Sequence, residues 1–147
     1  MTQKEKIWIG LLALATMLTL AAGHWAYFPG DLTLTRFVQL LASESTGWAQ
    51  MVSSTAKFPW SLALLAITIG ISWRLAGWRA ALLAVASFLG MWALGKYLGP
   101  WVGRPRPSPE LVRVAEKFSG YSFPSIFALT YASTIGFLAV LFARKSS

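Results

Sequence analysis

The chain has 147 residues, of which 56% are hydrophobic and 12% are charged; soluble domains average roughly 25% charged residues, so we expect an integral membrane protein forming a single domain over residues 1–147. Its net charge of +8 comes largely from basic residues that flank apolar runs, which argues against a nucleic-acid partner because that would need a concentrated basic face. With no cysteine and one histidine, disulfides and clusters of cysteine or histidine metal ligands are excluded, and we expect no cofactor and no metal.

The first apolar run covers residues 7–23, about the length of a membrane-spanning helix. Lys4 and Lys6 precede it, and Trp25 and Tyr27 follow it. Basic residues on one side and aromatic residues on the other are typical of a transmembrane helix. The alternative is a cleaved signal peptide, which this run exceeds in length because signal cores span roughly 7–15 residues.

Hydrophobicity falls between residues 29 and 59, where apolar residues recur at helical spacing opposite a polar face. The apolar positions are Leu34, Phe37, Val38, Leu41, Trp48, Met51 and Val52. This pattern predicts short amphipathic helices that lie on the membrane surface or cap the bundle.

Three further apolar runs cover residues 58–75, 80–98 and 123–143, and the tight basic turn 74–79 joins the first two of them. The sequence therefore predicts an all-α integral membrane protein, a bundle of four transmembrane helices with short amphipathic interfacial helices in its outer loops. Aromatic residues near the ends of the runs are the expected anchors at the membrane interface. These anchors are Trp25, Tyr27, Trp60, Trp73, Trp78 and Trp101.

The distribution of charge predicts an orientation. Residues 1–6, 74–79 and 144–147 together carry six basic residues and one acidic residue in 16 positions, whereas the much longer remainder carries seven basic and four acidic residues. Because basic residues favour the cytoplasmic side, we expect both termini in the cytoplasm and the two long loops outside. We expect the bacterial cytoplasmic membrane as the location.

The loop after the third run is rich in basic residues and proline, reading Lys96-Tyr-Leu-Gly-Pro-Trp-Val-Gly-Arg104-Pro-Arg106-Pro-Ser-Pro. Its four prolines between positions 100 and 109 forbid a regular helix through the loop. Ser108 as an N-cap and Pro109 as the first helical position predict a short helix that extends to about Phe118.

Lys96, Arg104 and Arg106 are candidates for binding phosphate at the membrane surface. Guanidinium groups match phosphate oxygens in pairs, and an ammonium group adds a point charge. The alternative is that the two arginines only anchor the loop to lipid phosphates.

The lysine, the Arg-Pro-Arg-Pro sequence, the predicted short helix and Ser119-Gly-Tyr-Ser-Phe-Pro124-Ser125 at the start of a new span resemble the type 2 phosphatidic acid phosphatase superfamily. The resemblance covers about residues 60–143. Members are integral membrane lipid-phosphate phosphatases, in which lysine, arginine and serine bind the phosphate, one histidine is the general acid and another is the nucleophile. The resemblance implies a phosphate site formed by Lys96, Arg104, Arg106 and Ser125.

Three features depart from the family pattern. Seven residues separate Lys96 from Arg104 and nine separate it from Arg106, whereas the family has six. If Arg106 matches the family's arginine, the lysine position falls on Gly99. Ser-Ile-Phe, ending at Phe127, stands in place of the family's Ser-Gly-His, and a phenyl ring cannot act as a general acid. The chain also stops before the segment that would supply the nucleophile.

We therefore expect a catalytically lapsed or partial relative, not an enzyme by itself, that serves as a membrane scaffold or as a small subunit of a membrane complex. Its expected partners are anionic or phosphate-bearing lipids and other membrane protein chains, or further copies of itself. The alternative is a phosphatase of phosphatidate or isoprenyl phosphate that a partner chain completes, or that uses His24. A small transporter is disfavoured because no acidic residue lies in the four runs.

Overall fold

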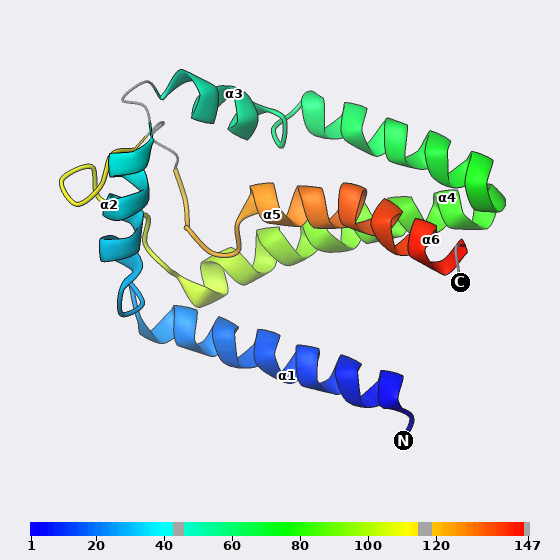
Figure 1. Cartoon of the computed structure of the whole chain (residues 1–147), viewed down its shortest axis with the longest axis horizontal. Coiled ribbons are helices and arrows are strands. Elements are labelled where there is room, and N and C mark those ends of the chain that lie inside the picture. Colours follow the sequence, from blue (N-terminus) through cyan, green and yellow to red (C-terminus); the bar gives the residue numbers. More distant parts are fainter. Residues whose placement is uncertain (43–45, 115–118, 146–147) are drawn as a thin grey trace.

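The computed structural model describes residues 1–42, 46–114 and 119–145, in which every regular element is a helix (Figure 1). The elements are α1 (Gln3–His24), α2 (Asp31–Leu41), α3 (Gly47–Ser54), α4 (Trp60–Val102), α5 (Ile126–Tyr131), the π-helical turn η1 (Ala132–Gly136) and α6 (Phe137–Lys145). Within the described ranges, three helices are long and apolar enough to cross a membrane: Glu5–His24, Trp60–Val102 and Ile126–Lys145. The all-helical class is confirmed, and these three helices indicate a membrane protein.

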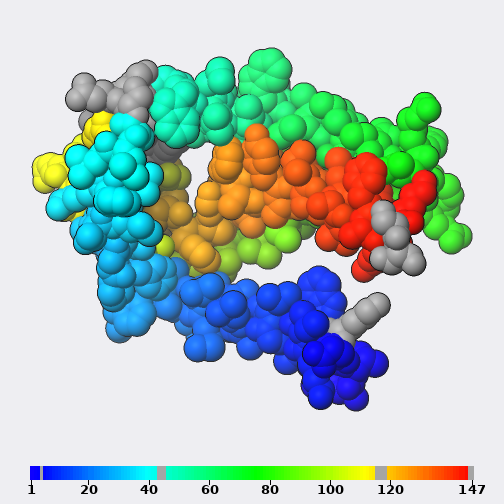
Figure 2. All heavy atoms as spheres, viewed as in Figure 1, coloured from blue at the N-terminus to red at the C-terminus, as the bar shows by residue number. Residues whose placement is uncertain are grey.

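Helix α1 begins four residues before the predicted run because Thr2 and Glu5 form a capping box. The Thr2 hydroxyl accepts a hydrogen bond from the Glu5 amide at 3.3 Å, and the Glu5 carboxylate accepts one from the Thr2 amide at 2.8 Å. Near the other end of α1, Ala22 is buried and Gly23 lies beside Val102 of α4. The space-filling view shows a hollow between the rest of α1 and the C-terminal helices (Figure 2).

Helices α2 and α3 confirm the predicted amphipathic helices. Helix α2 runs across the ends of the long helices (Figure 1), with Phe37 and Leu41 exposed on its apolar face. Its polar face binds the loop that follows α4: Arg36 Nε donates to the Leu111 carbonyl at 2.9 Å, and Gln39 Nε2 donates to the Arg113 carbonyl at 2.8 Å. Helix α2 is therefore fastened to the proline-rich loop.

Helix α4 reverses direction at Gly77. There φ is 78° and ψ is −175°, a conformation that is essentially restricted to glycine. The two arms, residues 60–76 and 78–102, meet at Gly77 and extend from it toward the same end of the molecule (Figure 1). The predicted runs 58–75 and 80–98 fall on the two arms, and the turn predicted at residues 74–79 is confirmed.

The second arm continues past the end predicted for the third run. The prolines of the loop predict no helix at Pro100, but Pro100 lies inside α4, which ends at Val102. A proline removes one backbone donor, and here this loss falls in the last turn of the helix. Gly103 then closes α4 with φ at 67°, its amide donating to the Gly99 carbonyl at 2.9 Å.

The short helix predicted from Pro109 does not form over residues 109–114, and residues 115–118 lie outside the described part of the chain. Ser108 does accept a hydrogen bond from the Glu110 amide, at 3.2 Å, which opens a single turn. The Arg113 amide then donates to Gln39 Oε1 at 3.0 Å instead of continuing a helical ladder. A long-range bond to α2 thus overrides the local capping signal.

The bundle interior is built from small residues. Helices α5 and α6 and the turn η1 pack against α4, and Thr68 and Ser72 of α4 are buried with Ser133 and Thr134 of η1. The Ser133 and Thr134 hydroxyls both donate to the Thr130 carbonyl, at 3.0 and 2.7 Å. Small residues allow helices to approach closely. The Thr68 hydroxyl likewise donates to the Leu64 carbonyl at 2.8 Å, whereas the buried Ser72 hydroxyl has no hydrogen-bond partner among the described residues.

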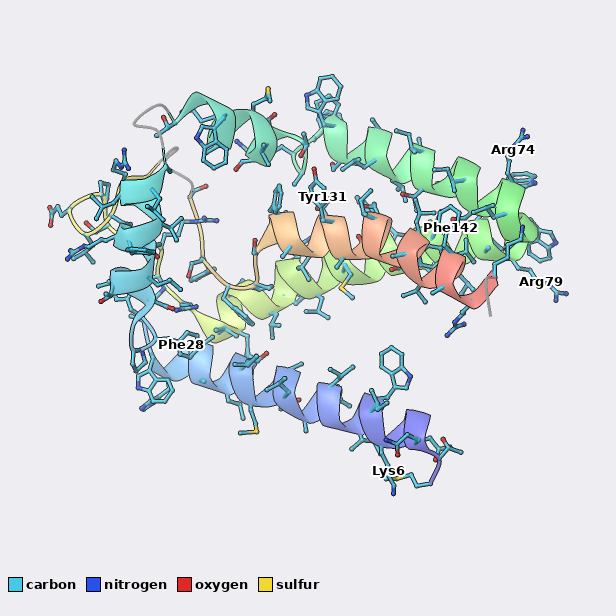
Figure 3. All side chains as sticks on the ribbon, viewed as in Figure 1. Lys6, Phe28, Arg74, Arg79, Tyr131 and Phe142 are labelled. Atoms are coloured by element: carbon cyan, nitrogen blue, oxygen red, sulfur yellow. The ribbon has the colours of Figure 1, made fainter. Side chains whose placement is uncertain are left out.

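Both termini and the turn at Gly77 lie at one end of the molecule, opposite α2 and the proline-rich loop (Figure 1). Lys145 Nζ donates to the Leu75 carbonyl at 3.2 Å, which joins the end of α6 to this turn. Lys6, Arg74 and Arg79 extend from the same end (Figure 3). The three basic segments of the sequence are therefore gathered at one end.

Candidate functional site

A cavity of about 400 Å3 lies where the α3–α4 connection, the proline-rich loop and the start of α5 meet. It is lined by Ser53, Ala56, Lys57, Arg106, Ser122, Ser125, Ile126 and Phe127. Two of these residues are basic, three are serines, and none of the described lining residues is acidic. We refer to this space as the basic cavity.

Lys57 comes from the short connection between α3 and α4. Its amide donates to the Ser54 carbonyl at 2.9 Å, and its carbonyl accepts from the Ser61 amide at 2.8 Å. These two bonds fix its backbone, and its side chain is half-buried. Lys57 could not be singled out from the sequence because it lies far from the proline-rich motif, although it is the one basic residue between positions 37 and 73.

Arg106 and Ser125, two of the four residues named from the sequence, line the basic cavity together. Ser125 is also the N-cap of α5, because its hydroxyl accepts a hydrogen bond from the Ala128 amide at 3.3 Å. Ser122, which the sequence did not single out, lines the same cavity from the segment that leads into α5. Its amide donates to the Arg104 carbonyl at 2.9 Å.

Arg104 does not line the basic cavity. Its Nη2 lies 2.8 Å from Asp31 Oδ2, its Nε donates to the Ala26 carbonyl at 3.1 Å, and its guanidinium carbon lies 4.6 Å from the centre of the Phe28 ring. The side chain is 16% exposed and faces a separate space of about 300 Å3 that Asp31 also lines. Arg104 is thus occupied in joining the proline-rich loop to the α1–α2 connection.

Lys96 also lies outside the residues that line the basic cavity. Its ammonium nitrogen is 5.1 Å from the centre of the Trp92 ring and 5.8 Å from that of Tyr97, which are cation–π distances. A Cβ placed at Gly99, one turn further along, would lie 3.6 Å from atoms of Tyr121 and Phe123. Gly99 therefore faces the segment before α5, whereas Lys96 lies over aromatic rings of its own helix.

Phe127 lines the basic cavity at the start of α5. Its ring stacks on Tyr131 with centroids 4.5 Å apart and an interplanar angle of 29°. The Tyr131 hydroxyl in turn lies 2.7 Å from Thr55 Oγ1 in the α3–α4 connection. His24 contacts Trp25 edge to face at the end of α1, with ring centroids 5.6 Å apart, and is not among the residues lining the cavity.

A second cavity, of about 350 Å3, adjoins the first and shares Ala56, Lys57 and Ile126 with it. Its lining is mostly apolar and comes from both arms of α4 and from α5. The apolar part includes Phe58, Leu62, Phe88, Met91, Trp92 and Leu129. The basic cavity thus adjoins a mostly apolar cavity at Lys57.

The expected interface anchors lie at or near the ends of helices. Their exposed fractions are 48% for Trp25, 60% for Trp60, 61% for Trp73, 58% for Trp78 and 69% for Trp101, whereas Tyr27 is half-buried. Exposed indole groups at helix ends suit a membrane–water interface. The anchoring role of these residues stays a prediction.

Comparison of the chain with protein-family models, with curated proteins and with solved structures finds no match. Any functional assignment therefore depends on the chemistry of the basic cavity and on the motif that contributes Arg106 and Ser125 to it.

Proposed function

We propose that this protein binds a phosphate-bearing lipid in the basic cavity and is a catalytically lapsed relative of the type 2 phosphatidic acid phosphatases, acting as a membrane scaffold or as a subunit of a membrane complex. The observation that carries the proposal is the meeting of Lys57 and Arg106, which come from distant parts of the chain, with Ser122 and Ser125 around one cavity.

The chemistry of these groups suits a phosphate. A guanidinium group donates two parallel hydrogen bonds to phosphate oxygens, and an ammonium group adds a compact positive charge. The Ser125 hydroxyl accepts its bond from the Ala128 amide, so its own hydrogen is available to a ligand. A bound dianion would meet two cations and no carboxylate among the described lining residues.

The adjoining apolar cavity supports a lipid over a free phosphate ion. A phosphate at Lys57 would leave an attached hydrocarbon chain beside Phe58, Leu62 and Leu129. Burial of each methylene group of such a chain contributes about 0.8 kcal/mol. The phosphate group of the lipid would thus occupy the basic cavity, and its hydrocarbon chain would occupy the adjoining apolar cavity.

Phe127 supports the loss of catalysis. A general acid must carry an exchangeable proton, and this ring fills the position that the family's histidine takes in the resembling motif. Its stacking on Tyr131 keeps it at the cavity wall. We expect binding without phosphate release.

Arg106→Gln is expected to weaken the binding of phosphatidic acid about tenfold or more, because a charge-assisted hydrogen bond contributes about 1.5–3 kcal/mol. The measurement is a titration of the purified chain in nanodiscs with phosphatidic acid, alongside diacylglycerol and inorganic phosphate as separate ligands. Arg79→Gln, at the opposite end of the molecule, is the matched control. Equal affinity of Arg106→Gln and the unaltered chain would refute the phosphate site, and release of phosphate would refute the loss of catalysis.

We further propose four crossings of the bacterial cytoplasmic membrane, with both termini and the Gly77 turn in the cytoplasm. The antiparallel arms of α4 and the clustering of basic segments at one end support this topology. Because the chain has no cysteine, single cysteines can report it without background. Glu110→Cys is expected to react with a membrane-impermeant maleimide in intact cells, whereas Gln3→Cys, Ala76→Cys and Lys145→Cys react only after lysis. Opposite labelling of Gln3→Cys and Lys145→Cys would instead show an odd number of crossings.

A further inference from the structure

The two arginines of the Arg-Pro-Arg-Pro sequence line different cavities. Arg106 lines the basic cavity, whereas Arg104, Pro105 and Pro107 line the smaller space beside α2. Ser122 lines both spaces. The proline-rich loop and Ser122 therefore lie between the two spaces. Of the loop residues that line either space, Arg106 is the one that lines the basic cavity.

The side chain of Arg104 joins the proline-rich loop to the α1–α2 connection. Its guanidinium group binds Asp31 and the Ala26 carbonyl and lies over Phe28, so it holds three points of the α1–α2 connection. The Asp31 carboxylate also accepts a hydrogen bond from the Phe28 amide at 3.0 Å. Because Asp31 begins α2, its negative charge is further stabilised by the positive end of that helix.

The main chain of Arg104 joins the proline-rich loop to the segment that leads into α5. Its carbonyl accepts hydrogen bonds from the Ser122 amide at 2.9 Å and from the Ser122 hydroxyl at 3.4 Å. One residue thus connects the α1–α2 connection, the proline-rich loop and the segment that leads into α5. Arg106 follows two residues later, across Pro105, whose ring restricts the backbone between them.

We propose that Arg104 is a positioning residue, which acts through its ion pair with Asp31 to hold Arg106 at the basic cavity and does not itself contact the phosphate. This inference rests on the proposed function of that cavity. The competing account is that Asp31 occupies Arg104 only until a phosphate arrives and takes the guanidinium group over.

The two accounts give opposite results for Asp31→Asn. If Arg104 is a positioning residue, loss of the carboxylate loosens the loop, and phosphatidic acid in nanodiscs binds about fivefold more weakly. This loss is smaller than that expected for a direct charge-assisted contact, because Asp31 and Arg104 act on the ligand only through Arg106. Asp31→Glu, which keeps the charge, should recover most of the affinity. If Arg104 is a ligand, Asp31→Asn releases it and binding tightens. Tighter or unchanged binding overturns the proposal.

A double-mutant cycle separates positioning from direct contact. Arg104→Gln is expected to weaken binding, but Arg104→Gln combined with Arg106→Gln should bind no worse than Arg106→Gln alone, because Arg104 acts through Arg106. Losses that multiply would show that Arg104 contacts the ligand independently. Arg36→Gln is the control and should leave affinity unchanged, because it removes a hydrogen bond from α2 to Leu111, which lies beyond Arg106 and does not line the basic cavity.

A measurement without ligand tests the positioning role even if the cavity does not bind phosphate. A spin label on Arg106→Cys should give a motionally restricted spectrum, which narrows when Asp31→Asn or Arg104→Gln is added and stays broad when Arg36→Gln is added. Unchanged mobility in the first two variants overturns the positioning role. Failure of the wild-type chain to bind phosphatidic acid, together with the expected narrowing, would instead refute the proposed function and leave the positioning of residue 106 established.

Discussion

Gly77→Ala is expected to destabilise the protein by about 1–3 kcal/mol, the usual cost of placing a non-glycine residue in a conformation that glycine alone adopts freely. A Cβ at this position would meet no atom within 4 Å. The expected cost therefore comes from the backbone, whose φ is 78° and ψ is −175°. Relief of that strain would require the two arms of α4 to change direction, so the loss should appear as reduced stability of the whole bundle.

Gly70→Ala is the matched control, since Gly70 lies in the same helix, is exposed and also has open space around its Cβ position. Its backbone is helical, so alanine should be neutral or stabilise the helix by up to about 1 kcal/mol. Unfolding of both variants in mixed micelles with increasing dodecyl sulfate, followed by circular dichroism, measures the difference. Equal stability of Gly77→Ala and Gly70→Ala would show that the turn is not held in this conformation.

The helices that depend on local patterns could be predicted from the sequence. Apolar runs of membrane length and apolar residues at helical spacing led to α1, α4, the C-terminal helix and the amphipathic α2 and α3. The turn at residues 74–79 followed from a short basic segment, with Arg74 and Arg79, between two apolar runs. The helix predicted from Pro109 was wrong over residues 109–114 because Gln39, on α2, takes the Arg113 amide that a helix would have used.

The candidate site was predictable only in part, for a similar reason. Arg106 and Ser125 belong to one sequence motif and do line one cavity. Arg104 belongs to the same motif, but its burial against Asp31 depends on how the α1–α2 connection lies. Lys57 enters from a third segment, and no spacing in the sequence connects it to the motif. Residues that meet through tertiary packing carry no joint signature in a single sequence.

Gly95→Leu is expected to destabilise the bundle where α4 packs against α5. A Cβ at Gly95 would lie 2.9 Å from Ile126 Cδ1 and 3.1 Å from Leu129 Cδ1, because α4 and α5 approach closely at this glycine. A methyl group alone needs only a small shift of two flexible side chains, but a leucine must displace α5, and overpacking of this kind typically costs about 1–3 kcal/mol. Since Ile126 lines both cavities, the displacement should also weaken phosphatidic acid binding.

Gly90→Leu separates this packing effect from the effect of adding a leucine to the helix. Gly90 lies on the same arm of α4, is exposed, and has no atom within 4 Å of its Cβ position. Leucine there gains up to about 1 kcal/mol of helix propensity over glycine, and Gly95→Leu gains the same amount before the clash is counted. The difference in unfolding free energy between the two variants therefore measures the contact of α4 with α5 alone. If the two variants unfold together, α5 does not pack against Gly95, and the start of α5, with Ser125 and Phe127, is not held at the basic cavity by this contact.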